Sequence, residues 1–272
     1  MLGYSFSVPS QLTFELDQSA VNIARGFAMD APLKAKSGHQ GTAMALAPLA
    51  HVLYSRIMKH DPTDALWPDR DRFVLSAGHA SILQYSMLFL QGYGLELSDI
   101  QNFRQWDSAT PGHPERGHTA GIEVTTGPLG QGFANAVGLA LAERHLRARF
   151  GSELTNHHTY VIAGDGCLME GVSHEAASLA GHQKLGRLIV VFDDNQITID
   201  GSTNLTCSDD VAMRFTSYGW DVVQLGSIGE DLDALESALV AARDSGDDRP
   251  KLLILRTQVG FPSPDWTGKH EA

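Results

Sequence analysis

The chain has 272 residues, of which 43% are hydrophobic and 19% charged, and its formal net charge is −12 at pH 7. This balance is typical of a globular protein with a sizeable core, while the acidity argues against a nucleic-acid surface, which needs a basic stripe. Two cysteines, Cys167 and Cys207, show no metal spacing and no disulfide framework. The longest apolar stretches are too short to span a bilayer, and the first cation is Arg25, unlike a signal peptide. We therefore expect a cytoplasmic protein without nucleic-acid or membrane partners.

The first third of the chain has the pattern of helices. Apolar residues recur at helical spacing, with Gly or Pro at the borders, over Gln11–Met29, Gly41–Lys59 and His79–Gly92. A further helix is predicted over Gly130–Arg149. One side of this helix is rich in small residues that permit close packing: Gly132, Ala136, Gly138 and Ala140.

In the second half, short aliphatic runs alternate with helical patterns. The runs are Tyr160–Ala163, Leu188–Phe192, Asp221–Leu225 and Leu252–Arg256, and the helical stretches are Met169–Gln183, Val211–Tyr218 and Leu232–Arg243. Apolar runs without alternation are typical of strands buried on both faces of a parallel sheet. The pattern predicts an α/β fold: one domain over residues 1–272, with a doubly wound, mainly parallel sheet and helices on both faces. Ligands of such sheets bind beyond the carboxyl ends of the strands.

Polar residues follow two of the predicted strands. Asp165, flanked by Gly164 and Gly166, ends one strand, and Asn195 ends the next. A carboxylate, an amide oxygen and the main-chain carbonyl of Ile197 would suit Mg²⁺, which takes oxygen ligands and leaves other positions to phosphate and water. The glycines would let the backbone approach a diphosphate, with a helix predicted to start near Leu168 offering N–H groups. Alternatively, Asp165 is a helix N-cap and Asn195 a turn residue.

This constellation resembles the thiamine-diphosphate motif, and the residues around it resemble transketolase. The resemblance extends over nearly the whole chain, through residues 37–39, 78–80, 111–115, 126–132, 164–176 and 194–203. It implies the cofactors thiamine diphosphate and Mg²⁺, for which Ca²⁺ or Mn²⁺ can substitute. It also implies transfer of a two-carbon ketol unit from a ketose or ketose phosphate to an aldehyde, with the cofactor carrying the difficult chemistry.

Four histidines acquire roles from the resemblance. His79 and His270 would contact the cofactor phosphates, while His39 and His113 would face the hydroxyls of the donor and the acceptor. His39, His113 and His270 would manage the hydroxyl protons, since imidazole exchanges protons near neutral pH. Three of the four directly follow a glycine in the sequence and lie in loops bounded by Gly or Pro.

Further site residues come from the same resemblance. In the loop of Gly127 and Pro128, the Gly127 carbonyl would face the aminopyrimidine of the cofactor, and Leu129 and Ile199 would pack against its rings. The alternative for this loop is a plain turn into a helix. For Glu170 two interpretations stay open. An acid is favoured in the first turn of a helix by the helix dipole alone, and the family has an acidic residue here that links paired active sites across a dimer interface.

The resemblance also shows what the 272 residues lack. The glutamate that activates the aminopyrimidine in transketolases comes from a second domain of the partner subunit, and no such domain follows His270. We expect the N-terminal subunit of a split enzyme, paired with a complementary C-terminal subunit in an α2β2 assembly. The alternative is half of a longer chain.

Two other functions are weighed. The first is a non-catalytic, cofactor-binding paralogue or structural subunit. The second is another magnesium-dependent phosphate enzyme, which would need a G-x-x-x-x-G-K-[ST] loop that the sequence lacks. Gln40 stands where the family usually has proline, and the sequence does not identify the sugars.

Overall fold

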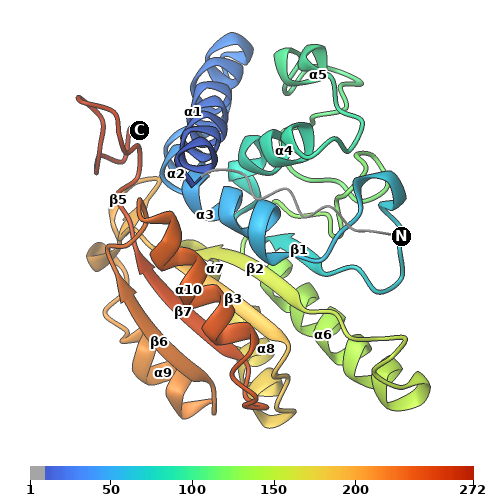
Figure 1. The fold of residues 1–272 in the computed structure, drawn as a ribbon. Coiled ribbons are helices and arrows are strands. Elements are labelled where there is room, and N and C mark those ends of the chain that lie inside the picture. Colours follow the sequence, from blue (N-terminus) through green and yellow to red (C-terminus); the bar gives the residue numbers. More distant parts are fainter. Residues whose placement is uncertain (1–9) are drawn as a thin grey trace.

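A computed structural model describes residues 10–272, with a five-stranded sheet at its centre (Figure 1). Residues 1–9, which belong to the predicted domain, lie outside the described range. All neighbouring strands of this sheet are parallel, in the order β1-β2-β3-β7-β6. The strands are β1 (Arg72–Leu75), β2 (Thr159–Gly164), β3 (Leu188–Asp194), β6 (Asp221–Gly226) and β7 (Lys251–Arg256). The predicted α/β fold is confirmed.

Helices cover both faces of the sheet (Figure 1). The helices that share the core of one face are α1 (Ser10–Ala35), α2 (Gly41–Ala45), α3 (Ala47–Val52), α4 (Ser81–Leu90) and α10 (Leu232–Arg243). Those of the other face are α6 (Gln131–Phe150), α7 (Asp165–Met169), α8 (Gly171–His182) and α9 (Val211–Ser217). The shorter elements are a π-helical turn (Leu53–Ile57), three 3₁₀ turns (Pro62–Asp64, Gly78–Ala80, Thr203–Leu205), helix α5 (Leu97–Gln101) and the antiparallel hairpin of β4 (Ile197–Thr198) and β5 (Gly201–Ser202).

Strand β3 shows why the sheet strands are apolar at successive positions. Ile189 and Val191 belong to the core on the α3 and α10 side, whereas Val190 and Phe192 belong to the core on the α6 and α8 side. Because helices cover both faces, every position of such a strand faces an apolar neighbour. Only the ends of the central strands are left for polar residues and ligands.

Several predicted helix boundaries are wrong. The helix predicted over Gln11–Met29 continues to Ala35 through Pro32, because tertiary packing of its buried alanines outweighs the missing proline N–H. The helix predicted over Gly41–Lys59 is divided into α2, α3 and the π-helical turn. Pro48 lies in the first turn of α3, where it has no N–H to continue the hydrogen bonds of α2.

Two other elements also differ from the prediction. Strand β1 is not predicted by the sequence, since its apolar run between Arg72 and Ser76 is too short to show a period. The helix predicted over Met169–Gln183 is interrupted at Glu170, whose extended backbone (φ −68°, ψ 137°) separates α7 from α8.

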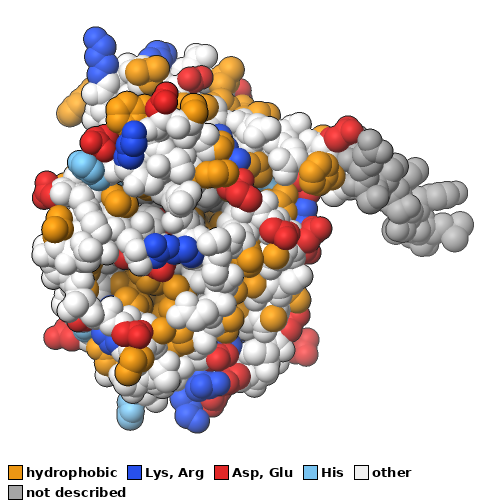
Figure 2. Space-filling view, turned by 90° about the vertical axis from the view of Figure 1, so that its left-hand side faces the viewer, with side chains coloured by type: hydrophobic (Ala, Val, Ile, Leu, Met, Phe, Trp, Pro, Cys, Tyr) orange, Lys and Arg blue, Asp and Glu red, His pale blue; other side chains and the backbone are white. Residues whose placement is uncertain are grey.

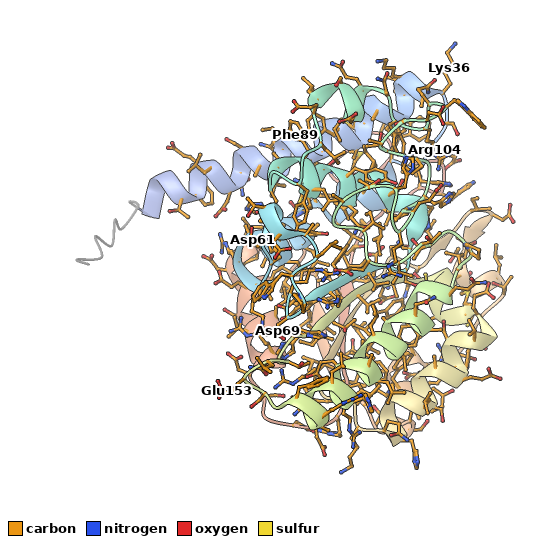
Figure 3. The ribbon with its side chains drawn as sticks, turned by 90° about the vertical axis from the view of Figure 1, so that its right-hand side faces the viewer. Lys36, Asp61, Asp69, Phe89, Arg104 and Glu153 are labelled. Carbon is orange, nitrogen blue, oxygen red and sulfur yellow. The ribbon has the colours of Figure 1, made fainter. Side chains whose placement is uncertain are left out.

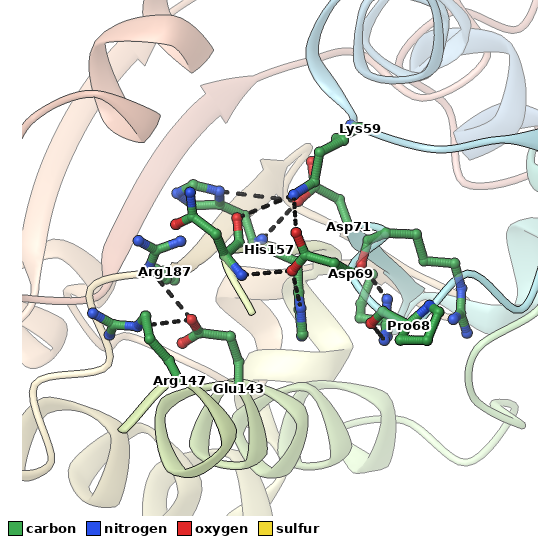
Figure 4. Close-up of polar contacts among 12 residues, drawn as sticks. Lys59, Pro68, Asp69, Asp71, Glu143, Arg147, His157 and Arg187 are labelled. Atoms are coloured by element: carbon green, nitrogen blue, oxygen red, sulfur yellow. Dashed lines mark hydrogen bonds and ion pairs between the residues drawn. The ribbon is translucent and has the colours of Figure 1, made fainter. Parts of the chain in front are cut away.

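An ionic network lies at the N-terminal ends of the sheet strands (Figure 4). The buried carboxylate of Asp71 accepts the backbone N–H groups of Lys59 (2.7 Å) and His158 (2.6 Å). Asp69 accepts the N–H of Asn156 (2.5 Å) and pairs with the Lys59 Nζ atom (2.5 Å). Glu143 of α6, also buried, pairs with the guanidinium groups of Arg147 and Arg187. These contacts stabilise the N-terminal ends of the strands. Asp165 and Asn195 lie at the opposite, C-terminal ends.

The surface is consistent with the composition. On the face shown in Figure 2, acidic and basic side chains are interspersed, and the basic ones form no continuous stripe. Among residues 10–272, no helix has both the length and the apolar character that crossing a membrane requires.

Candidate active site

A cavity of about 300 Å³ lies where β2 and β3 end. It collects residues from loops that are far apart in the sequence. The predicted site residues that line it are His39, His79, Gly127, Leu129, Gly164, Asp165, Gly166, Asn195, Ile197, Ile199 and His270. Three predicted residues, His113, Pro128 and Glu170, lie outside this lining.

The Asp165 and Asn195 turns meet because β2 and β3 are parallel neighbours, with Gly164 in register with Asp193. Asp165 Oδ2 accepts the N–H of Gln196 from the other turn at 3.1 Å. Asp165 is the first residue of α7 rather than its N-cap, which is Gly164. Helix α7 therefore begins three residues before the predicted start near Leu168.

Asn195 forms the local turn that was the alternative interpretation, since its Oδ1 atom accepts the N–H of Ile197 at 2.9 Å. An amide oxygen has two lone pairs, so this hydrogen bond leaves capacity for one further ligand. The turn and the metal-binding role are thus compatible.

The charges at these strand ends are closely spaced. Burial, with added repulsion from Asp193 and Asp194, raises the pKa of Asp165 to about 7 against the opposing hydrogen bond from Gln196. Burial likewise raises the pKa of Asp193 to about 6, opposed by hydrogen bonds from Thr257 and Asn195. A bound divalent cation would favour the ionised form of these carboxylates.

The chemistry of the donor set fits Mg²⁺ better than a metal that prefers His or Cys. In residues 10–272, no three side chains of His, Cys, Asp or Glu converge as a metal site by themselves. Asp165, Asn195 and the carbonyl of Ile197 offer oxygen atoms only, and Mg²⁺ takes one or two side-chain ligands beside phosphate and water.

The structure brings three of the predicted histidines together. The rings of His39 and His79 are in edge contact, with centroids 5.2 Å apart. A Cβ atom placed on Gly127 would lie 3.5 Å from the ring of His113, and one on Gly78 would lie 2.8 Å from the nitrogen of Gly127. The loops of His79, Gly127 and His113 therefore pack directly on one another.

These imidazoles favour the neutral form. Burial, with the charges of neighbouring His39, His113 and Arg104, lowers the pKa of His79 to about 4. Burial, and next the charge of Arg104, also lowers the pKa values of His39 and His113. At neutral pH each ring can therefore accept a proton or a hydrogen bond.

Arg104 is a site neighbour that the sequence does not predict. It has a left-handed backbone (φ 61°), and its guanidinium donates to Ser37 Oγ at 2.8 Å and to the carbonyl of Gly112 at 3.3 Å. Figure 3 shows it at the same end of the helical layer as Lys36. Arg104 thus joins the loops that carry His39 and His113. Its only signal in the sequence is its position shortly before the Pro111–Glu115 motif.

The remaining predicted residues vary in their placement. Leu129 packs on Gly166: a Cβ atom built on Gly166 would lie 2.8 Å from the Cδ1 atom of Leu129. Ile199 lies at the rim of the cavity and is 76% exposed. His270 is exposed, with its Nδ1 atom 3.3 Å from the Glu271 carboxylate.

Glu170 is displaced from its predicted position. It is the N-cap of α8 instead of a first-turn residue, and no capping hydrogen bond from its side chain is found in the described structure. Its Cβ atom lies only 2.6 Å from the point where a Cβ on Gly130 would be, so Glu170 packs against the N-terminal end of α6.

The tail of the chain closes the cavity on one side. Val259, His270 and Ala272 belong to its lining. Val259 and Ala272 approach residue 41 closely because it is a glycine: a Cβ atom there would lie 2.5 Å from Val259 Cγ2 and 3.0 Å from the Ala272 carbonyl oxygen. The first third of the chain and its last residues thus form one wall.

Residues 16–272 match the family model described as the transketolase, thiamine diphosphate binding domain. The chain belongs to this transketolase family. It is 54% identical over 254 residues to transketolase 2 of Escherichia coli, a match that covers 92% of this chain and 38% of that protein. It is 52% identical over 257 residues to the transketolase of Nostoc sp., covering 93% and 38%.

Solved transketolase structures share the fold. The enzyme from Leishmania mexicana superimposes with a TM-score of 0.90 at 46% identity, covering 94% of this chain and 38% of that one. The transketolase from Pichia stipitis in complex with sedoheptulose-7-phosphate gives a TM-score of 0.89 at 48% identity, with the same coverage. The resemblance inferred from the motifs is confirmed, and the chain spans 38% of the length of these transketolases.

Proposed function

We propose that this chain is the diphosphate-binding part of a transketolase-type transferase, with thiamine diphosphate and Mg²⁺ as cofactors. The observation that carries the proposal is the convergence of the Asp165 and Asn195 turns with His39, His79 and Gly127 around one cavity. The substrates would be a ketose or ketose phosphate as donor and an aldehyde as acceptor of a two-carbon ketol unit.

Each cofactor group has a proposed position. Asp165, Asn195 and the Ile197 carbonyl would hold Mg²⁺, or Ca²⁺ or Mn²⁺ in its place. The diphosphate would lie against the backbone of Gly164 and Gly166 and accept hydrogen bonds from His79 and His270. The carbonyl of Gly127, in its loop with Pro128, would face the aminopyrimidine, and Leu129 and Ile199 would contact the rings.

The chain's own contribution to catalysis would be orientation and proton handling. When bound, thiamine diphosphate supplies a nucleophilic carbon that makes the ketose C2–C3 bond cleavable. His39 and His113 would accept hydrogen bonds from donor and acceptor hydroxyls, since their lowered pKa values keep them neutral at pH 7. His270 at the mouth would assist in moving these protons.

The proposal includes a partner. Because the chain spans 38% of the transketolases that it matches, we infer that residues 1–272 form one cofactor-binding domain that works with a complementary pyrimidine-binding part. That part would be either a complementary C-terminal subunit, in a cytoplasmic α2β2 assembly, or another region of a longer chain. Glu170, outside the cavity, would serve in linking paired sites across the interface.

Cofactor titration tests the core of the proposal. Calorimetric titration of the chain with thiamine diphosphate should show binding that depends on Mg²⁺, and Asp165→Ala should abolish that dependence. Asp30→Ala, which removes an equal charge from an exposed position on α1, is the matched control and should bind as the wild type does. If Asp165→Ala also binds as the wild type does, the metal assignment is wrong.

A mixing experiment tests the activity. The chain should transfer a ketol unit only when it is combined with a protein that carries the pyrimidine-binding domain and its activating glutamate. Cofactor binding without activity in every such mixture would instead support the alternative, a non-catalytic paralogue or structural subunit.

A further inference from the structure

Asp193 is a buried carboxylate in the lining of the cavity, two residues before the predicted metal ligand Asn195. Asp193 is 1% exposed and lies near the C-terminal end of β3. One oxygen, Oδ2, accepts a hydrogen bond from the Asn195 Nδ2 group at 2.7 Å. The other oxygen, Oδ1, accepts a hydrogen bond from the Thr257 hydroxyl.

This pairing determines which way the Asn195 amide points. An ionised carboxylate only accepts hydrogen bonds, so it must face the NH₂ group of an amide and not its oxygen. The amide oxygen is thereby turned away from Asp193, towards the turn where it accepts the N–H of Ile197. Mg²⁺ requires an oxygen, so the opposite rotamer would present NH₂ and could not bind the metal.

Thr257 holds Asp193 in turn. It directly follows β7, the strand that pairs with β3 on the side away from β2. Its hydroxyl takes one oxygen of Asp193, and its N–H lies 3.4 Å from the carbonyl oxygen of Asp194. One oxygen of the carboxylate therefore accepts a hydrogen bond from Thr257 and the other accepts one from Asn195.

We propose that Asp193, held by Thr257, is a positioning residue that selects the metal-binding orientation of the Asn195 amide. The proposal rests on the metal site of the proposed function and deepens it. In this role Asp193 would not be a metal ligand, because its two oxygens accept hydrogen bonds from Asn195 and Thr257. It favours the orientation of the Asn195 amide in which the NH₂ group faces Asp193 and the oxygen is left for the metal.

The test uses isosteric exchanges and measures Mg²⁺ affinity by calorimetry in the presence of saturating thiamine diphosphate. In Asp193→Asn the new amide can pair with Asn195 in either orientation, which leaves only the N–H of Ile197 to favour the metal-binding one. The Kd for Mg²⁺ should therefore rise about 10–100-fold, the usual effect of losing a group that orients a metal ligand. In the exchanged double variant Asp193→Asn/Asn195→Asp, the amide at 193 would donate to the carboxylate at 195. An oxygen would again be free for the metal, and most of the affinity should return.

Asp194→Asn is the matched control. It removes the same charge from the next residue, which pairs with Arg256 at 3.1 Å, and should change the Kd for Mg²⁺ less than about threefold, as expected for a carboxylate that orients no ligand. Equal weakening in both single variants would indicate a charge effect and overturn the proposal. So would wild-type affinity in Asp193→Asn, or a double variant no better than that single variant.

The failure of this proposal can be told from failure of the proposed function. If the wild-type chain shows no Mg²⁺-dependent binding of thiamine diphosphate, both are wrong. If the wild type binds and Asp193→Asn binds equally well, only the positioning role is wrong. Should Asp193→Asn not fold, Thr257→Val against Thr257→Ser gives an independent comparison. Only the valine variant lacks the hydroxyl and should weaken Mg²⁺ binding, and equal affinities would overturn the proposal.

Discussion

Helix α6 contains two glycines for which the same substitution should have opposite effects. Gly132 is buried, and a Cβ atom there would lie 2.7 Å from the Cα atom of Ser76 and 2.9 Å from Thr126 Cγ2. Gly138 is exposed, and apart from its chain neighbours and the backbone of its own helix no described atom lies within 4 Å of a Cβ atom built on it. The predicted small-residue side of α6 is therefore wrong for Gly138, while Gly132, Ala136 and Ala140 are buried.

The magnitudes follow from these distances. In Gly132→Ala the new methyl group meets backbone that cannot rotate away, and overpacking of this kind costs about 1–3 kcal/mol. In Gly138→Ala the methyl group enters open space and the helix gains about 1 kcal/mol in propensity. The free energies of unfolding of the two variants should thus differ by about 2–4 kcal/mol, the sum of these two effects.

Urea denaturation followed by circular dichroism measures this difference. Gly132→Ala should also weaken thiamine diphosphate binding, because Ser76 precedes Ala77, a residue of the cavity wall. Equal stability of the two variants would refute the close contact between α6 and the end of β1. A destabilised Gly138→Ala would refute its exposed placement.

Three further predictions concern charged groups. Burial lowers the pKa values of His157 and His158 to about 4, so protons bind preferentially to the unfolded chain. This contribution to stability should be present above about pH 6.5 and be lost as the pH falls towards 4, and a pH series of urea midpoints should show a shallower fall in His158→Gln. Glu143→Gln should cost about 2 kcal/mol in the same assay, because it leaves its arginine partners without a carboxylate, whereas an unchanged midpoint would contradict the ionic network. Arg104→Gln should raise the pKa values of His39 and His113, measured by NMR titration, since the positive charge of Arg104 lowers both; unaltered values would contradict its placement.

Much of the sheet can be predicted from the sequence because its central strands are buried on both faces. Strands β2, β3 and β7 are continuous apolar runs, and β6 also shows a recognisable run. Strand β1 could not be predicted, since four residues at a sheet edge show no periodicity. The break at Glu170 depends on the backbone conformation of a single residue, which helical spacing does not reveal.

The candidate site divides in a similar way. Asp165 and Asn195 can be predicted from their positions after two apolar runs. The roles of the four histidines follow instead from the resemblance to transketolase, since a preceding glycine marks only three of them and His270 follows a lysine. Arg104 and Thr257 cannot, because their contacts arise only when the loop after α5 and the end of β7 reach the site. Asp193 does leave a signal, since a carboxylate ending a buried strand needs a hydrogen-bonding partner.

The contact of Gly41 with Val259 and Ala272 has a consequence for folding. A cavity whose wall joins the first third of the chain to its last residues can form only after a very long loop has closed, and such contacts are costly in entropy and form slowly. We expect the cavity to be completed late in folding, after the sheet. A ligand bound in it then contacts segments more than 200 residues apart in the sequence, such as His39 and Val259, and at 100 times its Kd it would add about 2.7 kcal/mol to the stability of the whole domain.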